Sequence, residues 1–143
     1  MNQITITGNV VYDPSTKGEG EKKSVNFRVA SNRRYRDAST GEWVDGGSTF
    51  IEVRCWRNLA ENVLQTIGRG VPVIVTGRLR SWESTIERGD SSERRTHYEI
   101  DAESVGVDLR WTAATVRSTK SSAVQRQEDV AIAEATAVAR EVV

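Results

Sequence analysis

The sequence has 143 residues, 37% of them hydrophobic, with 20 basic and 20 acidic side chains, one cysteine and one histidine. This length suits a single domain, the balanced charge does not by itself indicate a nucleic-acid partner, and the lone cysteine and histidine can form neither an internal disulfide nor a nitrogen–sulfur metal site. Because no apolar run could span a membrane and the N-terminus lacks the pattern of a secretion signal, we expect a cytoplasmic protein that binds no membrane, metal or cofactor.

The first part of the chain has the two-residue alternation of β-strands. A first strand is predicted at residues 4–13, where isoleucines alternate with threonines, and a second at residues 24–35. The turn-forming residues of 36–48 predict a flexible loop. Alternation then returns at residues 50–56, which predicts a third strand.

The rhythm becomes helical at Asn58. Apolar residues four apart predict a buried stripe on one helix face, made of Leu59, Val63 and Ile67 with Ala60 and Leu64 beside them. Asn58 is a suitable N-cap, and Glu61 completes a capping box. Gly68 is placed to end the helix in a left-handed conformation.

Two further strands complete the predicted fold. Residues 71–82 form the fourth strand, residues 87–95 a loop, and residues 96–111 the fifth strand, with an irregularity near Ser104. Five strands with one helix between the third and the fourth indicate an all-β OB-fold, a five-stranded Greek-key barrel. We assign this domain to residues 1–116.

Residues 117–143 are predicted to be a C-terminal tail. The strand pattern fades after Trp111, and the end of the chain is rich in alanine and valine. Disorder and a short helix that packs elsewhere are equally compatible with this composition.

Aromatic rings and arginines fall together on the strand face opposite the aliphatic residues. In the third strand, Phe50 and Trp56 alternate with the core-type residues Val53 and Cys55. Arg54 shares this face with Phe50 and Trp56. Alternation likewise places Arg28 on the side of the second strand that faces away from its core residues. On the fourth strand it places Arg78, Arg80 and Trp82 together on that side. Exposed rings beside guanidinium groups suit single-stranded nucleic acid, because unstacked bases lie on rings while cations meet phosphates.

A second small core or a subunit interface is the alternative interpretation of these rings. Any one of them fits that alternative as well as it fits binding, but their repeated pairing with arginine favours binding for the set. An enzyme is not indicated, because no nucleophile, base or paired carboxylates have a catalytic spacing.

Three other aromatic residues are harder to place. Strand parity puts Tyr35, within an Arg33 and Arg34 cluster, on the core side unless a bulge or strand end precedes Arg33. Trp43 lies in the predicted loop, where clamping a ligand and packing on the barrel are equally open. Trp111, at the end of the fifth strand, is expected to be structural.

Four segments of the chain resemble the bacterial single-stranded DNA-binding protein family. They are ITITGNVVYDP, RRYRDASTGEW, FIEVRCWRNLAENV and GVPVIVTGRLRSW, which stand in the family's order within residues 1–116. The resemblance implies an OB-fold that assembles as a homotetramer and coats single-stranded DNA without strong sequence preference in replication, recombination or repair. Such a protein would associate with the nucleoid.

The resemblance also implies which residues contact DNA. The family's stacking aromatics correspond to Tyr35, Phe50, Trp56 and Trp82, and phosphates would meet arginines at positions 28, 33, 34, 54, 78 and 80. The chain departs from the family at its C-terminus, because it ends AVAREVV in place of an acidic tip that recruits genome-maintenance proteins. Recruitment is therefore not expected from the resemblance. A protein-assembly module and an RNA-binding module stay open as alternatives, since stacking does not distinguish sugars.

Overall fold

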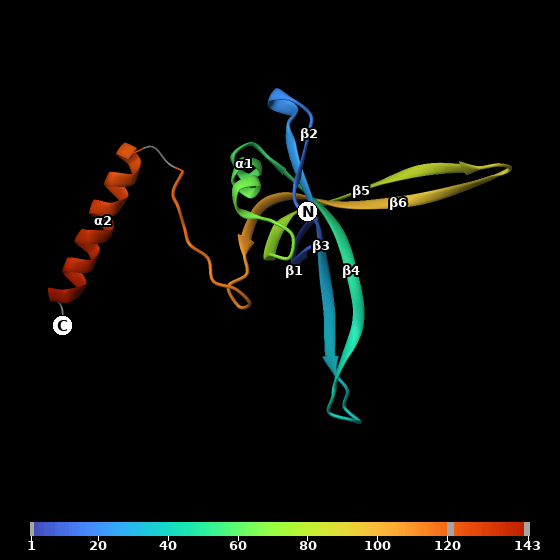
Figure 1. Cartoon of the computed structure of the whole chain (residues 1–143), viewed down its shortest axis with the longest axis horizontal. Coiled ribbons are helices and arrows are strands. Elements are labelled where there is room, and N and C mark those ends of the chain that lie inside the picture. The colour runs from blue at the N-terminus through green and yellow to red at the C-terminus, as the bar shows by residue number, and fades with distance from the viewer. Residues whose placement is uncertain (1, 120–121, 142–143) are drawn as a thin grey trace. The chain divides into compact units, whose positions relative to one another are not determined.

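β-strands make up most of the first part of the chain (Figure 1). The structure is a computed structural model that describes residues 2–119 and 122–141. Contacts divide the chain into two units, Met1–Ala113 and Ala114–Val143. The first unit contains β1 (Gln3–Val10), β2 (Ser15–Lys17), a 3-10 helix (Gly20–Lys22), β3 (Ser24–Arg36), β4 (Trp43–Trp56), α1 (Arg57–Thr66), β5 (Pro72–Arg88) and β6 (Ser91–Val107). The second unit contains α2 (Ser122–Glu141).

The strands form one sheet in the order β1-β5-β6-β4-β3-β2. β1 also pairs with β3, where Asn9 stands opposite Ala30 and Val10 opposite Val29. The pairing therefore runs from β1 through β5, β6, β4 and β3 back to β1, and we call these paired segments the closed sheet. Gly8 permits the close approach of β1 to β3, because a Cβ atom there would collide with the Ala30 backbone.

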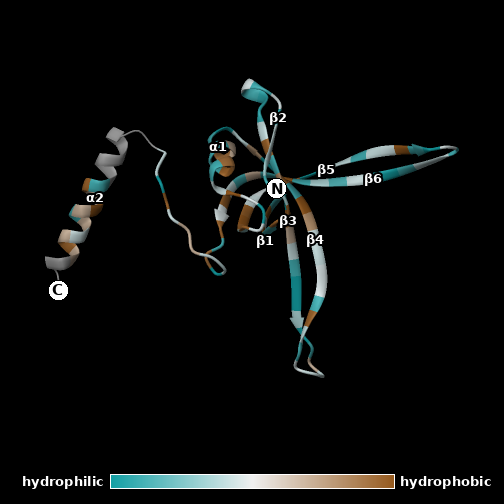
Figure 2. Cartoon of the chain, in the orientation of Figure 1, coloured by the Kyte–Doolittle hydropathy of each residue, from teal (hydrophilic) through white to brown (hydrophobic). Residues whose placement is uncertain are grey.

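Aliphatic side chains fill the inside of the closed sheet, as the strand alternation predicts. Val25, Phe27, Val29, Val53, Cys55, Val73, Val75 and Ile100 have no exposed surface. α1 covers part of this core with the buried Ala60 and Val63, and Ile67, directly after the helix, is also buried, whereas Leu64 of the predicted stripe is exposed. Figure 2 shows hydrophobic residues mainly where the strands meet near α1. Truncating the central Phe27 to alanine would cost about 3–5 kcal/mol of stability.

Two segments that the sequence predicts as loops are parts of long hairpins. β3 and β4 stay paired as far as Arg36 and Trp43, and β5 and β6 as far as Arg88 and Ser91. We call residues 32–48 the β3–β4 arm and residues 82–97 the β5–β6 arm. They extend beyond the closed sheet as two ribbons in Figure 1. The loop predictions hold for residues 37–42 and 89–90 and were wrong for the paired residues on either side. These residues pair beyond the core and are mostly polar, so they show no sustained hydrophobic alternation.

Both ends of α1 differ from the prediction. The helix begins at Arg57, which has a φ of 56°, and no side chain caps its first turn, so the predicted cap at Asn58 was wrong. Thr66 ends the helix, and the left-handed glycine that follows is Gly70, with a φ of 86°, and not Gly68. The carboxylate of Asp13 fixes this connection by accepting a hydrogen bond from the Arg69 amide at 2.8 Å.

The predicted irregularity near Ser104 is present. The pairing of β5 with β6 shifts between Thr76, which faces Ser104, and Gly77, which faces Ala102. Gly77 lies so close to the Asp101 backbone that a Cβ atom would not fit. The glycine therefore allows β5 and β6 to approach each other closely where their pairing shifts.

The structure has a second α-helix that the predicted fold class omits. α2 spans 20 residues of the C-terminal unit. The last residues of the end AVAREVV, positions 142–143, lie outside the described residues. In the described part of the chain, no helix is long and apolar enough to cross a membrane.

Candidate nucleic-acid interface

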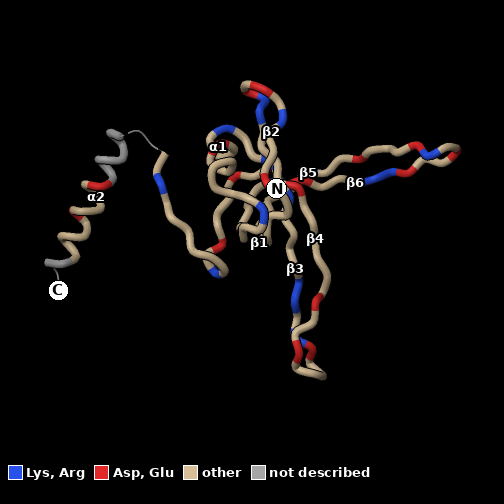
Figure 3. The backbone as a smooth tube through the Cα atoms, viewed as in Figure 1, with Lys and Arg blue, Asp and Glu red and all other residues tan. Residues whose placement is uncertain are grey.

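One face of β3, β4, β6 and β5 carries the predicted site residues of the closed sheet. Cα partners in neighbouring strands share a face. Arg28 stands opposite Glu52, Glu52 opposite Glu99, and Glu99 opposite Arg80, and a parallel row contains Asn26, Arg54, Asp101 and Arg78. We call this side, which points away from the core, the outer face. The outer face carries both cations and carboxylates, and Figure 3 likewise shows basic and acidic residues interspersed along the strands.

Phe50 lies on the outer face with its ring half exposed. The guanidinium carbon of Arg28 is 4.9 Å from the ring centroid, and Arg28 Nε is 3.7 Å from a Glu52 carboxylate oxygen. Tyr12 donates its hydroxyl to both oxygens of Glu52, at 2.8 and 3.1 Å. Burial, and then this hydrogen bond, raise the pKa of Tyr12 to about 12. Glu52 thus holds both Arg28 and Tyr12 beside an open ring.

Trp56 is half buried and held in one orientation. Its indole nitrogen donates a 3.0 Å hydrogen bond to Oδ1 of Asp101, and the Arg54 guanidinium lies 5.8 Å from its ring centroid. Arg54 is itself fixed by an ion pair of 3.3 Å to Glu99 and a 3.1 Å hydrogen bond to Asn26. Because the Glu99 side chain is only 8% exposed, Arg54 has a structural role in addition to its place on the outer face.

Trp82 lies at the start of the β5–β6 arm with its ring half exposed. The ring stacks on His97, at a centroid distance of 5.4 Å and an interplanar angle of 17°. His97 shares a 2.6 Å hydrogen bond with the Ser84 hydroxyl. One ring face of Trp82 is therefore covered within the protein by His97.

Tyr35 is exposed on the β3–β4 arm. Between Asn32 and Arg34 the pairing advances by two residues on β3 and by three on β4, so the extra residue of this irregularity lies on β4, opposite Arg33. The alternation of β3 itself is unbroken, so the bulge considered before Arg33 is not present, and Tyr35 is exposed because this part of β3 extends beyond the core. The tyrosine is thus on an arm, separated along β3 from the rings of the closed sheet.

The six predicted arginines fall into two groups. Arg28 and Arg54 form ion pairs with Glu52 and Glu99. Within residues 2–119, no carboxylate lies in ion-pair range of the other four, which are Arg33, Arg34, Arg78 and Arg80. All four are exposed, so they are available to a ligand's phosphates.

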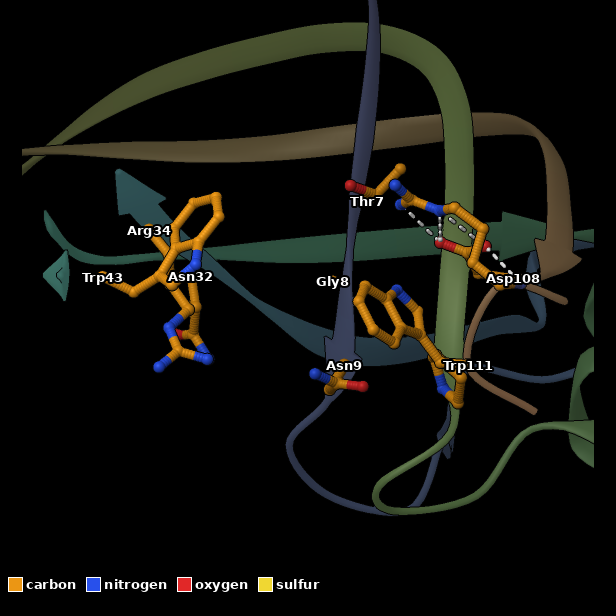
Figure 4. Close-up of a pocket in the computed structure, with 10 residues that line it drawn as sticks. Thr7, Gly8, Asn9, Asn32, Arg34, Trp43, Asp108 and Trp111 are labelled. Atoms are coloured by element: carbon orange, nitrogen blue, oxygen red, sulfur yellow. Dashed lines mark hydrogen bonds and ion pairs between the residues drawn. The ribbon is translucent and has the colours of Figure 1, made fainter. Parts of the chain in front are cut away.

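A cavity of about 830 Å³ opens between β1, the β3–β4 arm and the segment after β6. Trp43 and Trp111 line it, and they are 66% and 73% exposed. For Trp43, whose clamping of a ligand and packing on the barrel were equally open from the sequence, this exposure does not fit packing. It also does not fit the structural role expected for Trp111. Figure 4 shows Trp43, Arg34 and Asn32 on one side of β1, and Trp111 and Asp108 on the other. Sequence reasoning could not group the residues that line this cavity, because they come from β1, β3, β4, β5 and the segment after β6.

The lone cysteine lies in the core and not on the outer face. Among the described residues, no group of three histidine, cysteine or acidic side chains could hold a metal ion. Cys55 is fully buried, and this burial, with a smaller effect of Asp101, raises the pKa of its thiol to about 12. The outer face therefore offers rings, guanidinium groups and carboxylates.

The sequence matches the Single-strand binding protein family over residues 1–108. The chain belongs to this family. Among its curated relatives, the single-stranded DNA-binding protein 2 of Streptomyces coelicolor is 43% identical over 122 residues, which are 83% of this chain and 58% of that protein. The single-stranded DNA-binding protein of Mycobacterium leprae is 39% identical over 120 residues, which are 83% of this chain and 70% of that protein.

Solved structures of the single-strand binding protein family resemble this fold. The crystal structure of a small single-stranded DNA-binding protein from Streptomyces coelicolor aligns with a TM-score of 0.64 and 36% identity. The alignment covers 77% of this chain and 96% of the crystallised chain. The second single-stranded DNA-binding protein of Mycobacterium smegmatis aligns with a TM-score of 0.59 and 31% identity, over 82% of this chain and 98% of that one.

Proposed function

We propose that this protein binds and coats single-stranded DNA, largely without sequence preference, and serves replication, recombination or repair. The observation that carries the proposal is the set of exposed or half-buried rings beside arginines: Tyr35, Phe50, Trp56 and Trp82. Stacking on such rings contributes about 1–3 kcal/mol for each base and is open to any base, because every base has a π face. The relatives' names, single-stranded DNA-binding proteins, support the same function.

We infer a division of labour among the arginines. Arg33, Arg34, Arg78 and Arg80 neutralise phosphates, because no carboxylate among the described residues competes for them. Arg28 and Arg54 lie over Phe50 and Trp56 and, being already paired, contribute less net charge. Since log affinity falls by about 0.7 per phosphate neutralised as log salt rises, this arrangement gives a shallow salt dependence with stacking dominant.

The proposal includes the architecture and assembly that the family resemblance implies. The ring of strand pairings from β1 back to β1 supports a five-stranded Greek-key OB barrel, with α1 between β4 and β5. In a homotetramer, four outer faces would be available to one strand of DNA. Its mass is measurable by light scattering, independently of DNA.

Fluorescence anisotropy tests the function directly. A labelled single-stranded oligonucleotide is titrated with protein and compared with the same sequence as a duplex and as RNA. We expect much tighter binding of the single-stranded DNA, because duplex bases are already stacked on one another. Equal affinity for the duplex would contradict the proposal, and a preference for RNA would reassign the protein to the RNA-binding alternative. If Trp56→Ala abolished a protein complex but left oligonucleotide affinity unchanged, the outer face would be an assembly surface.

A further inference from the structure

The cavity beside β1 presents two indole rings that the proposed stacking set does not include. Trp43 comes from the start of β4 and Trp111 from the segment after β6, and both rings are largely exposed where they line the cavity. Large aromatic side chains usually bury most of their surface in a protein that has no ligand for them. Two of them at one concave site indicate a planar ligand.

The Trp111 side of this cavity is fixed in place. The Asp108 side chain, which is only 4% exposed, accepts hydrogen bonds from Arg110 Nη2 at 2.8 Å and from Arg110 Nε at 3.1 Å. The Asp108 amide donates to the Pro72 carbonyl at 2.8 Å, which ties this segment to β5. Arg110 in turn lies 5.6 Å from the centroid of Trp111. The ring is therefore backed by a guanidinium group, as Trp56 is by Arg54.

The Trp43 side of the cavity supplies polar groups and a free cation. Arg34 lines the cavity, and no carboxylate among residues 2–119 is within ion-pair range of it. Asn9 and Asn32 also line it, and their carboxamides offer both donors and acceptors to a base edge. Ser48 donates a 2.6 Å hydrogen bond to Asn32 Oδ1, which orients that carboxamide.

The cavity continues the outer face at Phe50. Phe50 stands opposite Ala30 on β3, and Ala30 stands opposite Asn9 on β1, which lines the cavity. Partners in register share a face, so the three side chains form one row. The row spans two strand spacings, about 10 Å, from the ring of Phe50 to the cavity.

We propose that this cavity is an additional binding subsite for an unstacked nucleobase of the single strand that crosses Phe50. The base stacks on Trp43 or Trp111, Arg34 meets a neighbouring phosphate, and the carboxamides of Asn9 and Asn32 contact the base edge. The inference rests on the proposed function and extends it. In this arrangement the single-stranded DNA would run from β4 across β3 and β1, and so beyond the four proposed stacking rings.

Tryptophan emission tests the subsite separately from overall binding. The chain has four tryptophans, so a Trp56→Phe/Trp82→Phe variant keeps indoles only at positions 43 and 111. Addition of oligothymidylate to this variant is expected to quench its emission, because a base stacks on a remaining indole. Binding that is detected by anisotropy without any quenching would overturn the subsite but leave the proposed function standing. If the unmodified protein did not bind the oligonucleotide at all, the proposed function itself would fail.

Affinity measurements provide a second test that does not depend on the double variant. Trp111→Ala and Trp43→Ala are each compared with Leu109→Ala, which removes an exposed apolar side chain near Trp111 that does not line the cavity. At least one tryptophan variant is expected to lose about fivefold or more in affinity for a long oligothymidylate, and the leucine variant almost none. Unchanged affinity in both tryptophan variants would contradict the subsite. A fall in oligomer mass without a change in quenching would show that the cavity is an interface between copies of the chain, which also contradicts it.

Discussion

The indole nitrogen of Trp56 on β4 donates its hydrogen bond to Asp101 on β6, 45 residues away in sequence. The two strands run parallel at this level, and Arg54 is the Cα partner of Asp101. A carboxylate next to a phosphate-binding surface is electrostatically unfavourable for DNA. Its hydrogen bond accounts for its presence if Trp56 stacks on a base as proposed, because it holds the ring in one orientation and would reduce the entropy lost on stacking.

We predict opposite effects for two substitutions of Asp101. Asp101→Asn removes a negative charge but keeps an oxygen that accepts the Trp56 hydrogen bond, so affinity for single-stranded DNA should equal or exceed that of the unmodified protein. Asp101→Ala removes the same charge but also frees the indole, so it should bind about fivefold more weakly than the asparagine variant. Anisotropy titrations measure both constants.

A Trp56→Phe background is the control for this prediction. Phenylalanine keeps an aromatic ring but has no N–H, so there the alanine and asparagine variants of Asp101 should bind alike. If Asp101→Ala still binds DNA more weakly than Asp101→Asn in the Trp56→Phe background, Asp101 does not act through the indole of Trp56.

The two ion-paired arginines should differ in their effect on stability. Arg54→Ala leaves the buried carboxylate of Glu99 without its ion-pair partner and should lower the free energy of unfolding by about 1–3 kcal/mol. Arg28→Ala removes an exposed ion pair with Glu52 and should cost less than about 1 kcal/mol. The variants are well matched, because each arginine also lies over an aromatic ring.

Urea unfolding at a fixed protein concentration measures both of these changes. Adding Glu99→Gln to the Arg54→Ala variant should recover part of the loss, since no unpaired charge is then buried. Equal midpoints for the two single variants would show that the burial of Glu99 does not matter.

Tyr12 should make stability depend on pH in the alkaline range. Its pKa is about 12 in the folded protein and about 10 in an unfolded chain. Because the folded state holds the proton more tightly, this contribution is complete below about pH 10 and disappears as the pH rises toward 12. The absorbance of tyrosinate should show a step near pH 12 that is missing in Tyr12→Phe. A variant with the same titration curve as the unmodified protein would refute the assignment.

The unpaired arginines should determine the salt dependence of DNA binding. Arg80→Ala should reduce the slope of log affinity against log salt by about 0.7, the value for one phosphate on a single strand. Arg94→Ala is the control, because strand alternation from the Trp82–His97 pair places Arg94 on the opposite face of the β5–β6 arm. The same reduction of slope in both variants would mean that charge acts without regard to face.

The sequence alone determined which side of each strand of the closed sheet points outward. Side-chain alternation is a local property of extended backbone, so the spacing of Val53 and Cys55 was enough to place Phe50 and Trp56 on the opposite face. Alternation also predicted the core. It failed in the two arms, where no core imposes a pattern, and at the ends of α1, where the helix begins without a side-chain cap.

Only the tertiary structure decided which groups act together. Three features join residues from different strands and segments: the pairing of Arg54 with Glu99, the hydrogen bond of Trp56 to Asp101, and the lining of one cavity by both Trp43 and Trp111. Strand register and the return of β1 to β3 set these contacts, and both depend on how the whole core packs. No local pattern encodes them, because a charge or a ring has the same sequence signature whether its partner is water, a carboxylate or another ring.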